Sequence, residues 1–140
     1  MENQFIALKL SNEEYAVDIL AVKEIIRWTH LTRVPKAPFF IQGVLNLRGN
    51  VIPVINSHLR LQLSVTTPTE KSRIIILNVD DLVVGFIVDE VIEVITLSKE
   101  MLEKPQLVEG SYRFIKNIGK INDRVIIILD LDKIVDLNLY

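Results

Sequence analysis

The chain contains no cysteine and only two histidines among its 140 residues. Neither a disulfide nor a thiolate metal ligand can therefore form, and two histidines are too few for the usual zinc sites. The sequence also lacks the run of roughly 20 apolar residues that crosses a bilayer. Its start lacks the basic and then apolar pattern of a signal peptide. We expect a cytoplasmic protein with no cofactor, no metal and no direct membrane contact.

The chain also lacks a strong charge of one sign, since 16 Lys and Arg stand against 18 Asp and Glu. Aromatic residues are few, with one Trp, three Tyr and five Phe. A nucleic-acid-binding module needs a positive surface, so this composition disfavours one. The glycine patterns of dinucleotide sites, phosphate loops and nucleophile elbows are missing as well. We therefore predict that the protein is not an enzyme.

What the sequence has is β-branched and aliphatic mass, because 49% of its residues are hydrophobic. Short polar inserts separate the apolar runs and predict four β-hairpins. The loop Gly49-Asn50 predicts a type II′ turn, because it has Gly at its first position. The four inserts are Ser11–Glu14, Gly49-Asn50, Asp80-Asp81 and Asn122-Asp123.

The halves of the chain resemble each other. Val17-Asp18 is echoed by Val88-Asp89, and Ile41 and Ile115 each lie ten residues before a Val-Ile pair. Such self-similarity predicts two copies of one small β unit. The strand runs are nearly continuous in apolar residues, which predicts that both of their faces are covered.

We therefore place one β subdomain at residues 1–66 and a second at residues 67–140, packed face to face. The N-terminal strand can pair with either of them. A polar segment between the halves reads as a linker. Short helices are predicted at four places: Ile19–Ile26, Ser57–Leu63, Ser98–Glu103 and Leu131–Leu137.

The segment from Val34 to Ile55 resembles the signature of the CheW family, P-x-x-P-x-F-I-x-G-V-x-N-x-R-G followed by V-I-P-V-I. Further segments fit the same family in order along the chain: Tyr15–Ile19, Val22–Ile26, Val84–Val91 and Ile128–Ile134. One departure follows the signature, where the family usually has Asp-Leu and this chain has Asn56-Ser57.

The resemblance implies an all-β fold with a few short helices. In it, two tandem five-stranded SH3-like β-barrels pack against each other, and residues 1–140 form a single CheW-like domain. It also implies a non-catalytic chemotaxis adaptor that couples chemoreceptors, the methyl-accepting chemotaxis proteins, to the histidine kinase CheA. The implied partners are the CheA regulatory domain and the cytoplasmic receptor tip. The adaptor would be cytoplasmic and associated with membrane receptor arrays through these partners.

Alternatives stay open at this point. The same fold occurs as the regulatory domain of CheA and as the front half of CheV proteins, so the chain could be such a domain detached from its neighbours. A β-barrel nucleic-acid-binding module and a barrel that binds a small ligand are more distant alternatives.

The resemblance also suggests two sets of site residues. The receptor-binding set is Val22, Glu24, Arg48 and Val88. The kinase-binding set is Val44, Leu47, Gly49 and Asn50. From the residues alone, Arg48 is better explained by a solvated position or an internal ion pair, and Val88 by a place in the core.

Three further pairs of residues have a simpler interpretation. Asn46 and Gly43 are expected to be structural, Asn46 by satisfying backbone groups near a bend and Gly43 by permitting close backbone approach. Phe39 and Phe40 are adjacent and face opposite ways in an extended chain, so one fills the core and the other can anchor an interface. His30 and His58 are predicted to lie at the surface.

Overall fold

The structure is a computed structural model that describes residues 2–105 and 113–138. Its strands and short helices are β1 (Glu2–Leu10), β2 (Glu13–Asp18), η1 (Ile19–Ala21), β3 (Val22–Arg27), β4 (Ile41–Leu47), β5 (Asn50–Asn56), α1 (Ser57–Arg60), β6 (Arg73–Val79), β7 (Leu82–Val88), β8 (Glu90–Ser98), η2 (Lys99–Met101), β9 (Leu102–Glu103), β10 (Ile115–Ile121), β11 (Arg124–Leu129) and α2 (Leu131–Ile134).

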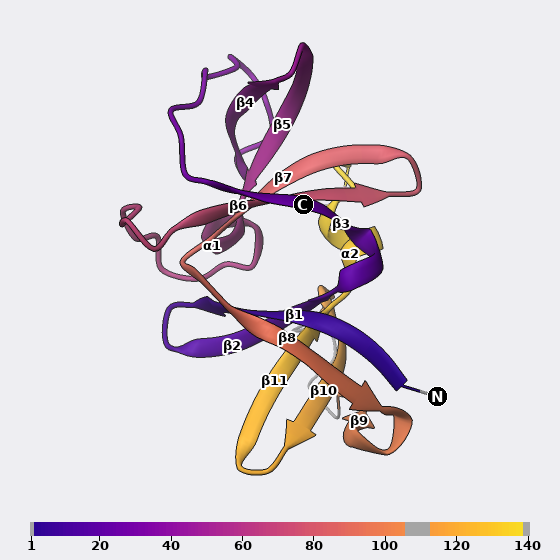
Figure 1. The fold of residues 1–140 in the computed structure, drawn as a ribbon. Coiled ribbons are helices and arrows are strands. Elements are labelled where there is room, and N and C mark those ends of the chain that lie inside the picture. The colour runs from indigo at the N-terminus through magenta and orange to yellow at the C-terminus, as the bar shows by residue number, and fades with distance from the viewer. Residues whose placement is uncertain (1, 106–112, 139–140) are drawn as a thin grey trace.

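These strands form two sheets, which lie one above the other in Figure 1. The upper sheet has the order β3-β6-β7-β5-β4, and the lower sheet has the order β8-β1-β2-β11-β10-β9. Pairing is antiparallel except between β5 and β7 and between β2 and β11. The predicted fold class, all-β with two small packed barrels and a few short helices, is confirmed. The lower sheet has one more strand than predicted, the two-residue β9.

The sheets do not divide the chain at the predicted boundary between residues 66 and 67. Each sheet takes strands from both halves, because the strand after each first hairpin crosses to the other sheet. β3 follows β2 but pairs with β6, and β8 follows β7 but pairs with β1. The predicted repeat is visible in the element order, but each barrel is a composite of both halves. Local sequence patterns predict the hairpins, but they do not determine which distant strands pair.

The hairpin between β4 and β5 closes differently from the predicted type II′ turn. Its loop is Arg48-Gly49, with φ of 50° and 87°, and Leu47 pairs with Asn50 across it. Positive φ at both loop residues is the property of a type I′ turn, which matches the twist of the two strands. The pairing register thus lies one residue earlier than predicted.

The predicted helix at Ile19–Ile26 is wrong for most of its length. Only η1 is helical, and Asp18 caps it by accepting a hydrogen bond from the Leu20 N–H at 2.9 Å. The β-branched and aliphatic residues that follow form β3 instead, because the edge of β6 is available for pairing. The other three predicted helices are present as α1, η2 and α2, each shorter than expected.

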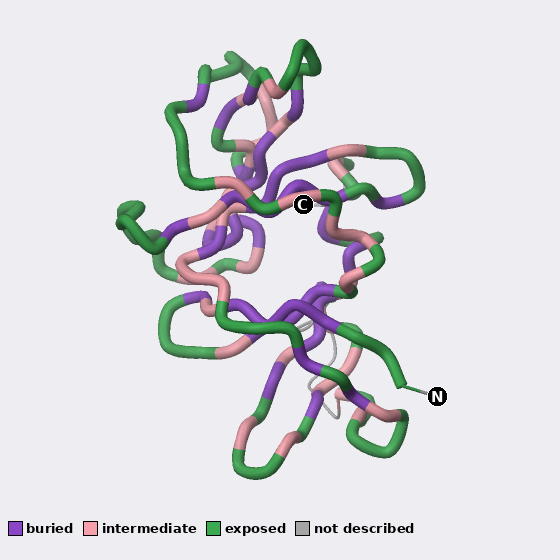
Figure 2. The backbone as a smooth tube through the Cα atoms, in the orientation of Figure 1, coloured by how far each residue is buried: buried purple, intermediate pink, exposed green. Residues whose placement is uncertain are grey.

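The apolar core has three parts. One cluster fills the upper barrel, one fills the lower barrel, and the largest lies between them. Strand β6 shows the division, since Ile74 and Ile76 belong to the upper barrel and Ile75 and Leu77 to the central cluster. This alternation explains why the strand is apolar at successive positions, as predicted for a strand covered on both faces. In Figure 2, buried backbone gathers where the sheets face each other and exposed backbone at the hairpin tips.

A buried arginine links the two short helices within this central region. The guanidinium of Arg60, at the end of α1, donates to the backbone carbonyls of Lys133, Ile134 and Asp136 at 2.9, 3.0 and 2.6 Å. It also lies over the rings of Phe40 and Phe114, 3.9 and 4.7 Å from their centroids. Burial lowers the pKa of Arg60. Its guanidinium still stays charged, because arginine is in effect always protonated in proteins.

Candidate functional site

Arg48 leaves the tip of the β4–β5 hairpin, at one end of the upper barrel. The turn is held by Asn46, whose side-chain oxygen accepts a hydrogen bond from the Gly49 N–H at 3.1 Å. This confirms the structural role predicted for Asn46. The side chain of Arg48 is 66% exposed, so its guanidinium is open to solvent on one side.

The other side of Arg48 faces Glu24 on β3. The two terminal nitrogens of Arg48 donate to the two carboxylate oxygens of Glu24, with Nη1 3.5 Å from Oε1. β3 and β4 are the two edge strands of the upper sheet, so the ion pair connects its opposite edges. The structure thus brings together two of the four residues of the predicted receptor-binding set. Arg48 makes the internal ion pair and stays exposed to a partner as well.

The two valines of that set lie elsewhere. Val22 begins β3 and is half-buried against the central cluster, so only part of its side chain reaches the surface. Val88 ends β7 and is completely buried in the same cluster. Its side chain cannot offer an outside contact, and its role in a binding surface is corrected to one in the core. The sequence pattern already allowed this, because Val88 follows a run of apolar residues.

The predicted kinase-binding residues lie together on the β4–β5 hairpin. Gly49 and Asn50 are exposed in and beside the turn, whereas Val44 and Leu47 are half-buried. Sequence reasoning missed Val51, which follows Asn50 on β5 and is 68% exposed. The sequence carried no periodic signal for it, because the residues from Val51 to Ile55 form a continuous apolar run.

Two hollows lie on either side of the β6–β7 turn, and one of them is lined by the Arg48–Glu24 pair. One, of about 260 Å³, is lined by the pair itself and by Asp81. The other, of about 370 Å³, lies between the barrels and is lined by Asp80, by strands of both sheets and by Leu20. The larger hollow is thus a groove between the barrels, whereas Arg48 and Glu24 line the other hollow. Leu20, on η1, is 91% exposed. Its exposure was missed because a longer helix was predicted there.

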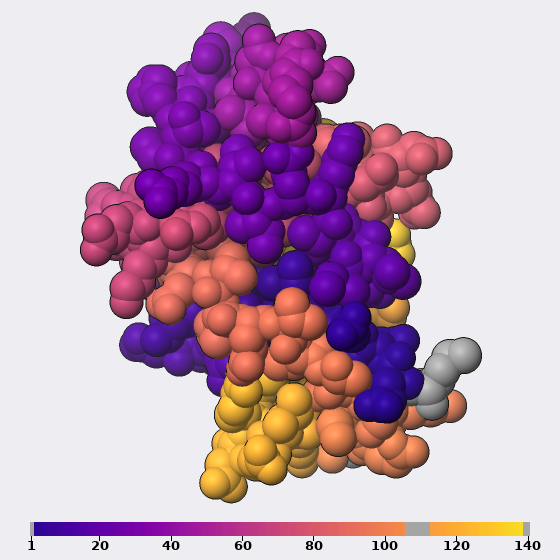
Figure 3. Space-filling model, in the orientation of Figure 1, coloured from indigo at the N-terminus to yellow at the C-terminus, as the bar shows by residue number. Residues whose placement is uncertain are grey.

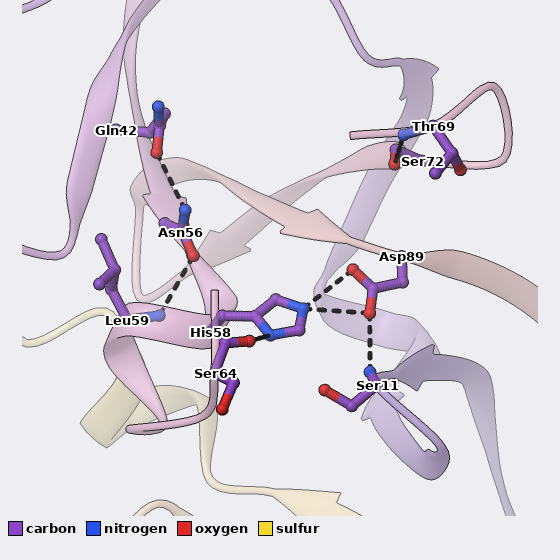
Figure 4. Close-up of polar contacts among 9 residues, drawn as sticks. All are labelled: Ser11, Gln42, Asn56, His58, Leu59, Ser64, Thr69, Ser72 and Asp89. Atoms are coloured by element: carbon purple, nitrogen blue, oxygen red, sulfur yellow. Dashed lines mark hydrogen bonds and ion pairs between the residues drawn. The ribbon is translucent and has the colours of Figure 1, made fainter. Parts of the chain in front are cut away.

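His58 is a buried histidine, and Figure 4 shows its polar contacts. His58 on α1 has Nδ1 2.7 Å from the carbonyl oxygen of Ser64 and Nε2 2.9 and 3.0 Å from the carboxylate oxygens of Asp89. That carboxylate also accepts a hydrogen bond from the Ser11 N–H at 2.7 Å, in the β1–β2 turn of the lower barrel. The predicted surface position of His58 is wrong, and the residue helps to join the barrels. His30 is exposed, as predicted.

Asn56, which departs from the family pattern, uses both ends of its amide. Its oxygen caps α1 by accepting from the Leu59 N–H at 3.1 Å, and its nitrogen donates to the side-chain oxygen of Gln42 at 2.9 Å. An aspartate could make the cap but could not donate to Gln42. The next residue, Ser57, is completely buried, and its hydroxyl has no hydrogen-bond partner within the part of the chain that the structure describes.

Side chains that could bind a metal do not gather in the described ranges, where no group of three or more His, Asp or Glu has a suitable arrangement. Over the same residues, no helix is long and apolar enough to span a bilayer.

Comparisons with known proteins agree with this architecture. A family model described as "CheW-like domain" matches residues 4–138. The chain belongs to the CheW-like domain family. A curated relative, the "Chemotaxis protein CheW" of Bacillus subtilis, is 38% identical over 135 residues, covering 95% of this chain and 86% of the relative. The protein of the same name from Rhizobium meliloti is 35% identical over 133 residues, covering 94% of this chain and 86% of the relative.

A solved structure supports the CheW-like fold directly. The crystal structure of the scaffolding protein TtCheW from Thermoanaerobacter tengcongensis matches with a TM-score of 0.92 and 34% identity, covering 100% of this chain and 97% of that one. This identity and coverage place the two composite barrels of the CheW-like chain in the same arrangement as in that scaffold.

Proposed function

We propose that this CheW-like protein is a chemotaxis adaptor that couples chemoreceptors to the kinase CheA by binding both, without chemistry of its own. The observation that supports the proposal most is the family membership together with a structural match to a scaffolding protein over the whole chain. The packed interior agrees with the proposal, because apolar side chains fill all three clusters. The candidate binding residues lie on the outer surface instead.

The receptor side is assigned to the ion pair of Arg48 and Glu24, with the exposed part of Val22. An exposed guanidinium that one carboxylate already orients offers its remaining donors in a fixed direction, which suits recognition of a polar group on a helix. The receptor's helical hairpin then lies along the hollows beside the β6–β7 turn.

The kinase side is assigned to the hairpin end, with Val44, Leu47, Gly49 and Asn50, and with the exposed Val51 on β5. A rigid type I′ hairpin carrying apolar and small residues is a suitable surface for another barrel end. Because Arg48 belongs to the same turn, a shift of the receptor on one side can alter the pose of the kinase on the other and so change the populations of its states.

A charge swap tests the receptor side. Arg48→Asp places two carboxylates side by side and should weaken receptor binding while the fold persists. The double variant Glu24→Arg/Arg48→Glu restores the ion pair with reversed ends. If the pair matters only to stability, the double variant binds receptor like the wild type, and the assignment of Arg48 as a contact is wrong. If Arg48 contacts the receptor, binding stays weak while the melting temperature recovers.

Asn50→Arg tests the kinase side at an exposed position. It should weaken binding of the CheA regulatory domain more than it weakens receptor binding, although Asn50 also lines the hollow beside Arg48. Val44→Asp should do the same, but Val44 is half-buried, so a circular dichroism melt must show that the barrel is folded. Unchanged kinase binding in Asn50→Arg and in a folded Val44→Asp variant would contradict the assignment.

A further inference from the structure

The loop of residues 31–40, which precedes β4, presents an exposed aromatic ring in a fixed position. Phe39 is 57% exposed, and its ring packs edge-to-face on the buried ring of Phe40 with centroids 5.3 Å apart. The signature P-x-x-P-x-F-I requires Phe40 but leaves the position of Phe39 open. The exposed ring is therefore a feature of this chain and not a requirement of the fold.

The loop is held rigidly against the sheet. Thr32 and Val44 exchange two backbone hydrogen bonds of 3.0 and 2.8 Å, which attach the loop to the edge of β4. Gly43 permits this approach, because a Cβ there would lie 2.6 Å from the Thr32 carbonyl oxygen. Pro35 and Pro38 restrict the backbone further. A large apolar group on such a loop loses little conformational freedom on binding, which favours a contact role.

The charge on this loop has one sign. Residues 25–69 contain no Asp or Glu. Arg33 and Lys36 on the loop are both exposed, and neither forms an ion pair within residues 2–105 and 113–138. Val34, between them, is also exposed. The loop and the β4–β5 hairpin together form the upper end of the molecule (Figures 1 and 3).

We infer that the 31–40 loop extends the kinase-facing end of the barrel and binds a partner surface with an apolar recess, bordered by carboxylates, that receives Phe39. This inference rests on the proposed function, because Val44, which the loop is bonded to, belongs to the kinase-binding set. The ring supplies apolar contact area, and Arg33 and Lys36 select an acidic border.

The test is calorimetric titration of the full chain with the CheA regulatory domain, at about 0.05 M and about 0.5 M salt. Phe39→Ala should weaken binding about ten- to thirtyfold at both salt concentrations. Arg33→Glu should weaken it about three- to tenfold at low salt and much less at high salt. Two matched controls lie on the lower barrel: Val125→Ala, at a side chain 58% exposed, and Lys99→Glu, at an exposed cation. Both should bind like the wild type, and all four variants should keep its melting temperature.

The outcomes separate the two proposals. If Asn50→Arg weakens binding but Phe39→Ala does not, the hairpin site stands and the role of the loop is wrong. If Phe39→Ala weakens binding while Arg33→Glu acts equally at both salt concentrations, the acidic border is wrong. If the wild-type chain does not bind the regulatory domain at all, the proposed function and this inference both fail.

Discussion

Arg60 should be one of the most costly side chains to remove, although it is charged and buried. Its three hydrogen bonds to carbonyls near the end of α2 and its position over two phenyl rings join α1 to α2. The variant Arg60→Met keeps a chain of similar length and removes the guanidinium. The carbonyls that it leaves are near the barrel junction and lose charge-assisted hydrogen bonds.

The magnitude follows from opposing terms. Each hydrogen bond from a charged donor contributes about 1.5–3 kcal/mol, and a desolvated cation–π contact contributes about 1–2 kcal/mol. Removal of the charge relieves a desolvation cost of several kcal/mol. We therefore expect the free energy of unfolding to fall by about 2–4 kcal/mol in Arg60→Met.

Urea unfolding measures this change, followed by circular dichroism and by the fluorescence of Trp28, the chain's one tryptophan. The exposed Arg33→Met is the control and should stay within about 0.5 kcal/mol of the wild type. A free energy of unfolding for Arg60→Met within about 1 kcal/mol of the wild type would refute the reasoning. The three carbonyls would then not depend on Arg60 for their stability.

Variants at four further residues probe other polar groups. Asn56→Asp keeps the cap of α1 and loses the hydrogen bond to Gln42, so urea unfolding should show a loss of stability below about 1 kcal/mol. Asn56→Ala loses both contacts and should lose about 1–2 kcal/mol. Equal losses in the two variants would contradict separate contributions of the cap and the hydrogen bond to Gln42. Asp89→Ala leaves buried His58 and the Ser11 N–H without their acceptor and should lower the free energy of unfolding by about 2–4 kcal/mol. A much smaller loss would argue against Asp89 as a link between the barrels. Ser57→Ala should leave the free energy of unfolding unchanged or raise it. The pKa of Glu14 is lowered by its hydrogen bond to Arg124, so this contribution is present above the ordinary carboxyl pKa and is lost as the pH falls through the lowered value. Between about pH 6 and 3 the wild type should therefore lose more stability than Glu14→Gln. The difference should be about 1 kcal/mol or less, because the Glu14–Arg124 pair is partly exposed. Parallel profiles of stability against pH would show that the pair contributes nothing.

The local parts of the fold could be predicted from the sequence because turns and strands are determined by neighbouring residues. Polar inserts such as Ser11-Asn12 and Asp80-Asp81 lie at the observed hairpins. The exchange of β3 and β8 between the sheets could not be predicted, because it depends on which distant edge is open. The buried position of His58 was missed for the same reason, since its partner Asp89 lies 31 residues away.

The candidate site was predicted in part. The family signature directed attention to Arg48, and the structure added the carboxylate of Glu24 that orients it. Val88 was misplaced, because an apolar residue at a strand end can face either the core or solvent and its sequence does not distinguish them. The exposure of Leu20 depends on a short 3₁₀ turn that the apolar pattern of the segment concealed.

The central claim is that one chain binds a kinase domain and a receptor at once, at two outer surfaces that meet at the β4–β5 turn. The most direct measurement is titration of the chain with the CheA regulatory domain, with a receptor tip fragment, and with each when the other is saturating. We expect binding in all four titrations, with a three-component complex in the last two. Displacement of one partner by the other, or failure of the chain to bind either, would contradict the account.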